Sequence, residues 1–272
     1  MRMRKKKHLE PRMEACAAWQ EKSPEQWKGR WKEKFPQAER ICLELGCGKG
    51  RFTVQTAQRE PNALFIAVER VPDALVMAME RAKEMALSNV IFICDDAAML
   101  SDWFDPNEID RLYVNFCDPW PSKKHAKRRL ICEAFLKSYR DILQDGGEIH
   151  FKTDNRPLFE FSLTQFPRAG YALSEVTFDL HADDPDVIMT DFETVFHEQG
   201  VKINRCVGTK QALPDEAAIA VMGEPALGLL DYWKEGDPIP RGLDRYVEEH
   251  RAHLAAQARK QAKQNRQNVS EE

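Results

Sequence analysis

The sequence predicts an α/β protein with a Rossmann-like, doubly wound, mostly parallel sheet and an antiparallel final strand. Two observations lead to this prediction. Short apolar runs alternate with helical stretches through the middle of the chain, and the first apolar run ends in a group of glycines. Strands that alternate with helices form βαβ units, and these units place their strands parallel to one another.

The parallel strands are expected at five short runs rich in Ile, Leu, Val and Phe. These runs lie at 41–45, 64–68, 90–94, 112–116 and 148–152. Two later runs, at 172–180 and 201–207, have no helix expected between them. We expect these two runs to form an antiparallel pair that completes the sheet.

Two helices are expected between the parallel strands. Apolar residues recur at helical spacing over 74–86, and Pro72 precedes them at a position typical of a helix start. A second apolar face covers 130–143, and the glycine pair at 146–147 is expected to end that helix.

The chain divides into three segments by composition. Residues 1–37 carry eleven basic side chains against five acidic ones and are expected to form a basic N-terminal helical arm. Residues 38–210 hold the alternating strands and helices and are expected to form one domain. Residues 211–272 contain four prolines and then a basic end rich in Ala and Gln. We expect them to be a C-terminal extension with a partly disordered basic tail.

Composition excludes several classes of protein. The chain has 272 residues, 43% of them hydrophobic, which excludes disorder over its whole length. No run approaches the ~18 apolar residues of a membrane span, and no apolar segment follows the basic N-terminus as in a secretory signal. The seven cysteines include no C-x-x-C pair, and four of them, at 42, 94, 117 and 206, lie in apolar runs. We therefore expect buried free thiols, no metal and a cytoplasmic location.

The distribution of charge is more informative than its sum. A formal net charge of −4 argues against a nucleic-acid partner when taken alone. However, the run Lys-Lys-His-Ala-Lys-Arg-Arg at 123–129 is strongly basic, while 179–193 holds six acids and no Lys or Arg. Such runs are most often solvated faces. This basic run follows an expected strand end directly, where a polyanion is its natural partner.

The first expected strand leads into the glycine loop Glu44-Leu-Gly-Cys-Gly-Lys-Gly50. Glycines allow a tight turn and a close approach of the backbone to a ligand at the carboxyl end of the strand. The spacing G-x-G-x-G differs from the G-x-G-x-x-G of dinucleotide folds. Glu44 would also repel a phosphate, whereas it suits the ammonium of an amino acid. The alternative is a tight turn without a ligand.

Two further acids follow the next strands. Glu69 ends the second strand, where it can accept hydrogen bonds from both ribose hydroxyls. Asp96 follows the third strand, where an adenine amino group would lie. For either acid alone, the alternative is an N-cap of the next helix. A glycine loop, a ribose acid and an adenine acid without a phosphate site predict S-adenosylmethionine rather than NAD.

The fourth strand ends in Asp118-Pro-Trp-Pro121. The prolines stiffen this turn and fix the directions of Asp118 and Trp120. Trp120 either stacks on a base or packs the turn, and these two interpretations are equally favoured.

These elements resemble the bacterial tRNA (guanine-N7-)-methyltransferase family. The resemblance covers roughly 38–210 in the family's order and includes the glycine loop, 115–121 with the basic run, Phe151-Lys-Thr-Asp-Asn155 and Thr190-Asp-Phe-Glu193. The glycine loop alone is a weak signal, whereas the Asp-Pro-Trp block with its basic run is specific. The resemblance implies a class I methyltransferase fold and S-adenosylmethionine-dependent methylation of guanine N7, at guanosine 46 of the tRNA variable loop.

The resemblance also implies a role for each matching residue. S-adenosylmethionine would be bound by Glu44, Gly46, Gly48, Glu69, Asp96, Ala97 and Asp118. The substrate guanosine would be bound by Lys123, Asp154, Thr190, Asp191, Phe192 and Glu193. RNA would be contacted by Lys124, His125, Ala126, Lys127, Arg128 and Arg129. Ser122 stands where the family usually has Lys, so either Ser122 or Lys123 takes that lysine's role.

The chemistry agrees with these residue types. Guanine N7 has a free lone pair and no proton, so it needs no general base, and the protein's task is positioning and electrostatics. Asp118 is the candidate catalytic residue because methylation leaves the purine positive. Asp154 and Glu193 can accept from guanine N1 and N2 hydrogens. An interior base must first be unstacked.

The expected partner is tRNA, and no membrane partner is expected. The expected oligomeric state is a monomer or weak homodimer.

Three alternatives remain. The first is a methyltransferase acting on an exocyclic amino group, although such enzymes use an Asn/Asp-Pro-Pro-aromatic turn. The second is a non-catalytic RNA-binding module, which the complete acid series disfavours. The third is an NAD oxidoreductase, which the loop spacing and Glu44 disfavour.

Overall fold

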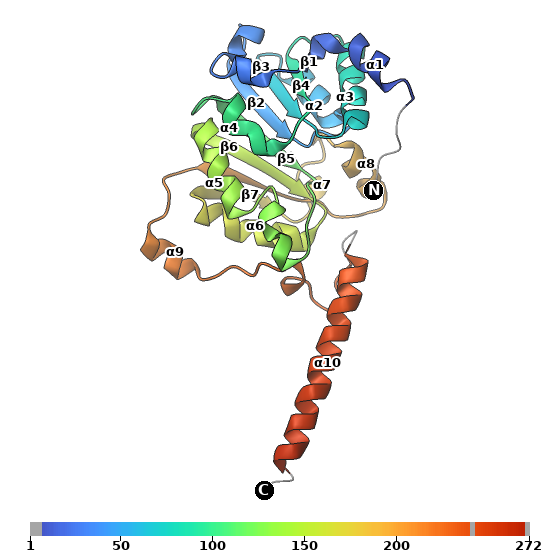
Figure 1. The fold of residues 1–272 in the computed structure, drawn as a ribbon, viewed down its shortest axis with the longest axis vertical. Helices are drawn as coiled ribbons and strands as arrows, with labels where there is room; N and C mark the ends of the chain where they lie inside the picture. The colour runs from blue at the N-terminus through green and yellow to red at the C-terminus, as the bar shows by residue number, and fades with distance from the viewer. Residues whose placement is uncertain (1–6, 240–242, 270–272) are drawn as a thin grey trace.

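The protein is built on an eight-stranded sheet, described here from a computed structural model that covers residues 7–239 and 243–269 (Figure 1). The strand order is β1-β4-β3-β2-β5-β6-β8-β7. The strands are β1 (Gln20–Glu21), β2 (Arg40–Leu45), β3 (Ala63–Val68), β4 (Val90–Ile93), β5 (Ile109–Asn115), β6 (Leu143–Thr153), β7 (Tyr171–Thr177) and β8 (Asn204–Lys210). Strands β1 to β6 pair in parallel, and β8 is antiparallel to both β6 and β7. The Rossmann-like sheet with an antiparallel final strand is therefore confirmed.

Helices cover both faces of this sheet. The helices of the described ranges, including α10, which does not cover the sheet, are α1 (Leu9–Ala15), α2 (Arg51–Arg59), α3 (Pro72–Glu84), α4 (Leu100–Trp103), α5 (Glu133–Ile142), α6 (Arg156–Arg168), α7 (Leu180–Asp183), α8 (Asp191–Glu198), α9 (Glu216–Met222) and α10 (Asp244–Val269). Six short 3-10 helices join them in the described ranges: η1 (Ala17–Trp19), η2 (Pro24–Trp27), η3 (Trp31–Lys34), η4 (Ala97–Met99), η5 (Lys123–Arg128) and η6 (Leu229–Asp231).

The core lies in two layers, because side chains alternate between the two faces of a strand. On β2, Ile41 and Leu43 join the layer that includes residues of α4, α5 and α6. Cys42 joins the opposite layer, with residues of α2 and α3. Since both faces are covered, the central strands are apolar along most of their length, as the sequence pattern requires.

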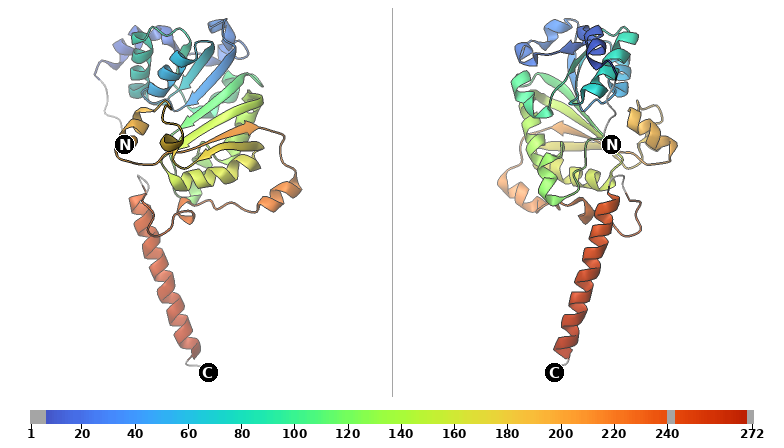
Figure 2. Two further views of the ribbon diagram at one scale, coloured as in Figure 1. Left: turned by 180° about the vertical axis from the view of Figure 1, so that it is seen from behind. Right: turned by 45° about the vertical axis from the view of Figure 1, so that its right-hand side comes forward.

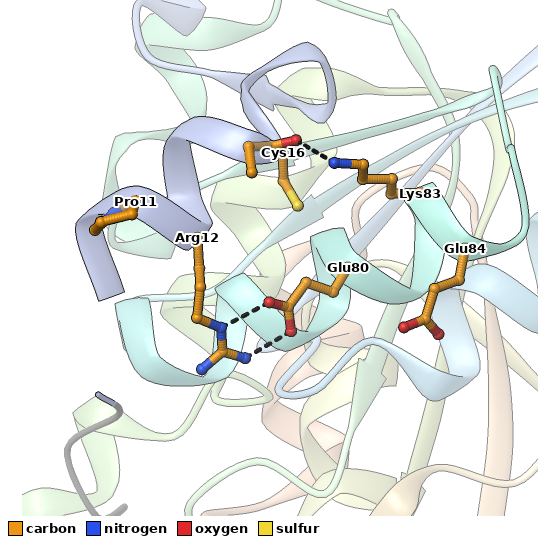
Figure 3. Close-up of a pocket in the computed structure, with 7 residues that line it drawn as sticks. Pro11, Arg12, Cys16, Glu80, Lys83 and Glu84 are labelled. Atoms are coloured by element: carbon orange, nitrogen blue, oxygen red, sulfur yellow. Dashed lines mark hydrogen bonds and ion pairs between the residues drawn. The ribbon is translucent and has the colours of Figure 1, made fainter. Parts of the chain in front are cut away.

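Residues 7–37, expected as a helical arm, lie against the domain. Strand β1 pairs with β4 at one edge of the sheet, and Trp31 is fully buried in the main core, where its ring nitrogen donates to the Trp103 carbonyl at 2.9 Å. Helix α1 lies beside α3, and Arg12 donates to both oxygens of Glu80 across a hollow between them (Figure 3). The four basic residues of this segment at 2, 4, 5 and 6 lie outside the described residues.

Two expectations about secondary structure were wrong. Helix α5 ends at Ile142, before the glycine pair at 146–147, because Leu143 already pairs with Ile109 and begins β6. The glycines lie inside β6, where the register with β5 shifts. The second correction concerns β7 and β8, which are separated by the short helices α7 and α8 rather than by a loop alone.

The C-terminal extension has ordered elements in the described ranges. Leu229 of η6 is fully buried in the main core. Helix α10 follows and projects away from the sheet in every view of Figures 1 and 2.

Of the four cysteines expected to be buried, Cys42 and Cys206 are buried, while Cys94 and Cys117 are half-buried.

Two further findings apply to the described ranges only. None of their helices combines the length and apolar character needed to cross a membrane. No group of three or more His, Cys, Asp or Glu side chains in these ranges is placed to hold a metal ion.

Candidate active site

Acidic side chains lie at the carboxyl ends of four neighbouring strands. Glu44 is on β2, and Glu69 follows β3 directly. Asp96 follows β4, and Asp118 follows β5. These strands are adjacent in the order β4-β3-β2-β5, and the chain reverses its direction of winding between β2 and β5. Ligands of doubly wound sheets bind at such a switch point.

The glycine loop presents bare backbone at this edge. Gly46, Gly48 and Gly50 all have positive φ angles, of 76°, 57° and 75°. A Cβ on Gly50 would lie 2.4 Å from the Ala78 Cβ, so this glycine lets α2 pack against α3. A Cβ on Gly46 or Gly48 would meet nothing within 4 Å. These two glycines therefore border open space that a ligand can enter.

Glu44 lies beneath the loop rather than in it. Its side chain is only 2% exposed, and its two oxygens accept hydrogen bonds from the Thr53 hydroxyl and, at 3.0 Å, from the Asn115 amide. Burial raises the pKa of Glu44, and these two hydrogen bonds oppose that rise. Sequence reasoning assigned no role to Thr53 or Asn115, whose polar groups fix this carboxylate under the glycine loop.

Glu69 ties the loop to the end of β3. Its oxygens accept from the backbone N–H groups of Gly48 at 2.9 Å and Val71 at 2.8 Å. Asp96 is exposed, and one of its oxygens accepts from the Ala98 N–H at 3.0 Å. Asp96 is thus an N-cap of η4, which was the alternative interpretation of this residue. Its neighbour at 97 is half-buried.

The Asp-Pro-Trp-Pro turn has a strained backbone. Phe116 and Trp120 have φ angles of 55° and 41°, which non-glycine residues adopt only where the surroundings hold them. Asp118 between them is exposed. The Trp120 ring packs edge-on against His125 and beneath the Arg128 guanidinium, which lies 4.9 Å from the ring centroid. The structure therefore shows Trp120 packing the turn.

Arg129 holds this turn from the inside. Its guanidinium is fully buried, lies 4.3 Å from the Phe161 ring centroid and donates to the carbonyls of Pro119 at 3.0 Å and Trp120 at 2.9 Å. It also donates to the Leu227 carbonyl of the C-terminal extension at 2.7 Å. Burial lowers the pKa of Arg129 to about 10. The predicted RNA contact by Arg129 is wrong for this conformation, because the side chain does not reach the surface.

The rest of the basic run divides by exposure. Lys124, Lys127 and Arg128 are exposed, His125 is half-buried, and Ala126 is buried and cannot contact RNA through its side chain. Lys123 is exposed and pairs with Asp231 at 2.9 Å, so the candidate substrate lysine is joined to η6. Ser122 precedes η5 as its N-cap residue.

The late Thr-x-x-Glu motif forms a capping box at the start of α8. The Thr190 hydroxyl accepts from the Glu193 N–H, and the Glu193 carboxylate accepts from the Thr190 N–H at 3.1 Å. Asp191 forms a bidentate pair with Arg81 of α3, at 2.7 and 2.8 Å. Phe192 is 54% exposed. Asp154, one residue beyond β6, is half-buried.

Glu193 is fully buried, contrary to the expectation that it faces the substrate. One of its oxygens accepts from the Lys152 ammonium at 2.8 Å. The other lies 3.3 Å from His181 Nε2 without hydrogen-bond geometry, so among the described residues this oxygen has no donor. In this structure the Glu193 carboxylate is therefore not placed to contact a guanine.

Sequence reasoning gives Lys152 no role, although this residue joins the two halves of the site. Its ammonium donates to Glu193 and to the Ile188 carbonyl at 3.0 Å, and lies 5.0 Å from the Phe52 ring centroid. Burial lowers the pKa of Lys152, and the Glu193 carboxylate opposes that change. The available signal was a lysine between Phe151 and Thr153, just before the carboxyl end of β6.

Comparisons with known proteins agree with this geometry. A family model described as "Putative methyltransferase" matches residues 38–206. A tRNA (guanine-N(7)-)-methyltransferase of Streptococcus agalactiae serotype III (strain NEM316) is 42% identical over 206 residues, which are 75% of this chain and 98% of that protein. A protein of the same name from Brevibacillus brevis is 44% identical over 181 residues, 66% of this chain and 85% of that protein.

Solved structures show the same fold at low sequence identity. The crystal structure of the 16S rRNA methyltransferase KamB has a TM-score of 0.53 at 13% identity, covering 68% of this chain and 94% of that chain. An antibiotic-related methyltransferase has a TM-score of 0.52 at 17% identity, with the same coverage of both chains. At these identities the likeness concerns the fold alone.

Proposed function

The chain belongs to the tRNA (guanine-N(7)-)-methyltransferase family, and from this premise we propose that it methylates N7 of guanosine 46 in tRNA, with S-adenosylmethionine as methyl donor. The observation that carries this proposal is the row of acids at four adjacent strand ends beside an open glycine loop. The relatives supply the reaction named in their descriptions, and the arrangement of residues supports each part of it.

The residues at the glycine loop fit S-adenosylmethionine. Gly46 and Gly48 leave open space beside their backbones, and Glu69 stands at the end of β3 with lone pairs left for ribose hydroxyls. The second carboxylate oxygen of Asp96 lies 3.6 Å from Arg70 Nη1 at the exposed edge, where it can also accept from an adenine amino group. Glu44 contributes negative charge from below the loop toward an ammonium group. S-adenosylmethionine, when bound, supplies an electrophilic methyl group.

The protein's own residues position the base and stabilise charge. N7 of guanine carries no proton, so no residue must remove one, and the barrier is lowered by orientation and electrostatics. Asp118 is exposed beside the open edge, where its carboxylate can stabilise the positive charge that develops on the purine. Asp154, at the end of the neighbouring strand β6, supplies an acceptor for guanine N–H groups.

A basic surface next to this pocket suits the RNA backbone. Lys124, Lys127 and Arg128 are exposed directly after the turn that carries Asp118. Contacts to phosphates position an RNA and contribute affinity that falls with salt. Such contacts can offset the cost of a few kcal/mol for unstacking the target base.

The experiment combines product identification with one matched pair of variants. Nucleoside mass spectrometry of unmodified tRNA treated with the enzyme and S-adenosylmethionine should show 7-methylguanosine. Asp118→Asn should lower kcat about 100-fold, in the range found when one stabilising group is removed from an active site. Asp102→Asn, an exposed acid on α4, should leave activity unchanged. A product methylated at an exocyclic amino group would favour the alternative enzyme class and overturn the proposal.

A further inference from the structure

The helix α10 lies outside the part of the chain that the family explains. The family match ends at residue 206, and the Streptococcus relative is matched over 98% of its own length by 206 residues of this chain. Helix α10 spans 26 residues, from Asp244 to Val269. Its function must therefore be inferred from its own residues and from its position.

The first turns of α10 are fixed beside the basic run. Leu243 and Val247 pack with Trp233 in a small apolar cluster. A groove runs between the two segments, lined on one side by residues 121–125 and on the other by Arg245, Tyr246, Glu249 and His250. The ion pair between Lys123 and Asp231 holds η6 against the same run. The helix therefore starts at the surface that we assign to RNA.

Beyond Arg251, which still contacts Glu235 and Trp233, the helix leaves the domain surface. Every residue from 251 to 261 is exposed, and the helix projects from the domain in Figures 1 and 2. At 1.5 Å per residue, the stretch 251–269 extends about 28 Å. Most helical stability in proteins comes from tertiary packing, so we expect a partner to stabilise a projecting helix of this length.

The charge of this projecting part has one sign. Residues 251–269 contain no Asp or Glu, while Arg259, Lys260, Lys263 and Arg266 are basic. Helical spacing places positions 259, 263 and 266 on one face, because they are four and three residues apart. Arg251 is set apart from this group, since it pairs with Glu235 and lies over the Trp233 ring.

The composition selects among partner classes. Leu254 is the one large apolar side chain between 251 and 268, so the helix lacks the repeating apolar seam of a coiled coil. For the same reason it lacks the apolar face with which amphipathic helices enter a membrane surface. The remaining residues are mainly Ala, Gln and Asn, which leave the basic side chains as the recognition element. A phosphate backbone fits this surface best.

We propose that α10 is a second RNA-binding surface, which extends the basic track of residues 123–128 along the tRNA beyond the reacting guanosine. This inference rests on the proposed function for its choice of tRNA as the bound RNA. Lys124, Lys127 and Arg128 hold the region near the active site, and the distal basic residues of α10 contact phosphates of a more distant part of the same molecule.

The test compares two full-length variants of α10. The first, R259Q/K260Q/K263Q/R266Q, removes four charges and keeps residues of good helix propensity. The control, Q257A/Q261A/Q264A/Q267A, changes four neutral positions of the same helix and keeps every charge. The dissociation constant for unmodified tRNA is measured from 50 to 300 mM KCl, and 7-methylguanosine is measured in parallel by mass spectrometry.

The charge variant should bind tRNA at least about tenfold more weakly at 100 mM salt. The slope of log affinity against log salt concentration should become smaller by about 2 to 4, which is about one for each phosphate that is no longer neutralised. The control should match the wild type. Equal affinities and slopes for the charge variant and the control would overturn the inference, even if 7-methylguanosine forms normally. If no 7-methylguanosine forms but the charge variant still binds tRNA more weakly, the proposed reaction is wrong and the surface stands.

Discussion

The adjacent arginines Arg128 and Arg129 offer the sharpest comparison in this structure. They look equivalent in the sequence, yet Arg128 is exposed, whereas Arg129 is fully buried and donates to the Pro119 and Trp120 carbonyls of the Asp-Pro-Trp-Pro turn. We expect Arg129→Gln to act on stability and on the position of Asp118. We expect Arg128→Gln to act on RNA binding.

The cost of Arg129→Gln follows from its contacts. Hydrogen bonds from a charged donor to the three carbonyls of Pro119, Trp120 and Leu227 contribute about 2 kcal/mol each. The burial that lowers the pKa of this guanidinium to about 10 offsets about 3 kcal/mol of that sum. The net loss in the free energy of unfolding is then about 3 kcal/mol, or a fall in Tm of roughly 6–12 °C.

Activity should fall together with stability. The turn residues Phe116 and Trp120 have strained φ angles, and without Arg129 the turn can relax. A displacement of Asp118 by about 1 Å is expected to lower kcat/KM by ten- to a hundredfold. The salt slope of tRNA binding should not change, because Arg129 touches no phosphate.

The assays are thermal unfolding, single-turnover methylation at a temperature where both variants are folded, and tRNA binding against salt. Arg128→Gln should keep the Tm within about 2 °C and lower the salt slope by about one. Arg129→Lys, which keeps the charge but not the fork of donors, should resemble Arg129→Gln. A lower salt slope at an unchanged Tm for Arg129→Gln would contradict this expectation, since that pattern belongs to an exposed phosphate contact.

Three further predictions concern the loop, the buried ion pair and pH. Gly50→Ala should lower the free energy of unfolding by about 2–4 kcal/mol through its clash with Ala78. Gly48→Ala should lower it by only about 1 kcal/mol and should mainly weaken binding of S-adenosylmethionine, measured by calorimetry. Equal effects of the two variants would contradict the assignment of Gly48 to the ligand and of Gly50 to helix packing. Lys152→Met should lower the free energy of unfolding by about 3–5 kcal/mol, because Glu193 is left buried and unpaired. In urea unfolding, the double variant Lys152→Met/Glu193→Gln should recover part of this loss. Additive losses from the two substitutions would contradict the ion pair. Burial lowers the pKa of His150, so below about pH 6.5 the unfolded state binds a proton more readily than the folded state. The unfolding free energy of the wild type should therefore fall from pH 7 to pH 5, and that of His150→Gln should fall by less. Identical pH profiles for the two proteins would exclude a contribution from His150.

Local and periodic features of the sequence predicted most of the fold. The five parallel strands that the sequence predicted are rich in apolar residues because helices cover both faces of the sheet, so their pattern is visible without any long-range contact. Strand β1, the sixth parallel strand, was not predicted. The glycine loop and the acids at 44, 69, 96 and 118 were predictable for a similar reason. Glu44 is the next-to-last residue of β2, the other three acids follow their strands within three residues, and the carboxyl ends of parallel strands meet at one edge.

The errors arose where a residue's partner is distant in the chain. Arg129 differs from Arg128 only because its side chain turns inward to carbonyls that include Leu227, 98 residues away. Lys152 and Glu193 are separated by 41 residues and meet only when α8 folds over β6. The glycine pair at 146–147 failed as a helix stop because strand pairing of Leu143 with Ile109 ends α5 earlier.

The identity of the methylated nucleoside tests the central claim most directly. An unmodified tRNA transcript is incubated with the enzyme and S-adenosylmethionine carrying an isotope-labelled methyl group, beside a transcript in which guanosine 46 is replaced by adenosine. We predict labelled 7-methylguanosine from the first transcript and none from the second. Label in any other nucleoside, or equal amounts of 7-methylguanosine from both transcripts, would contradict the account.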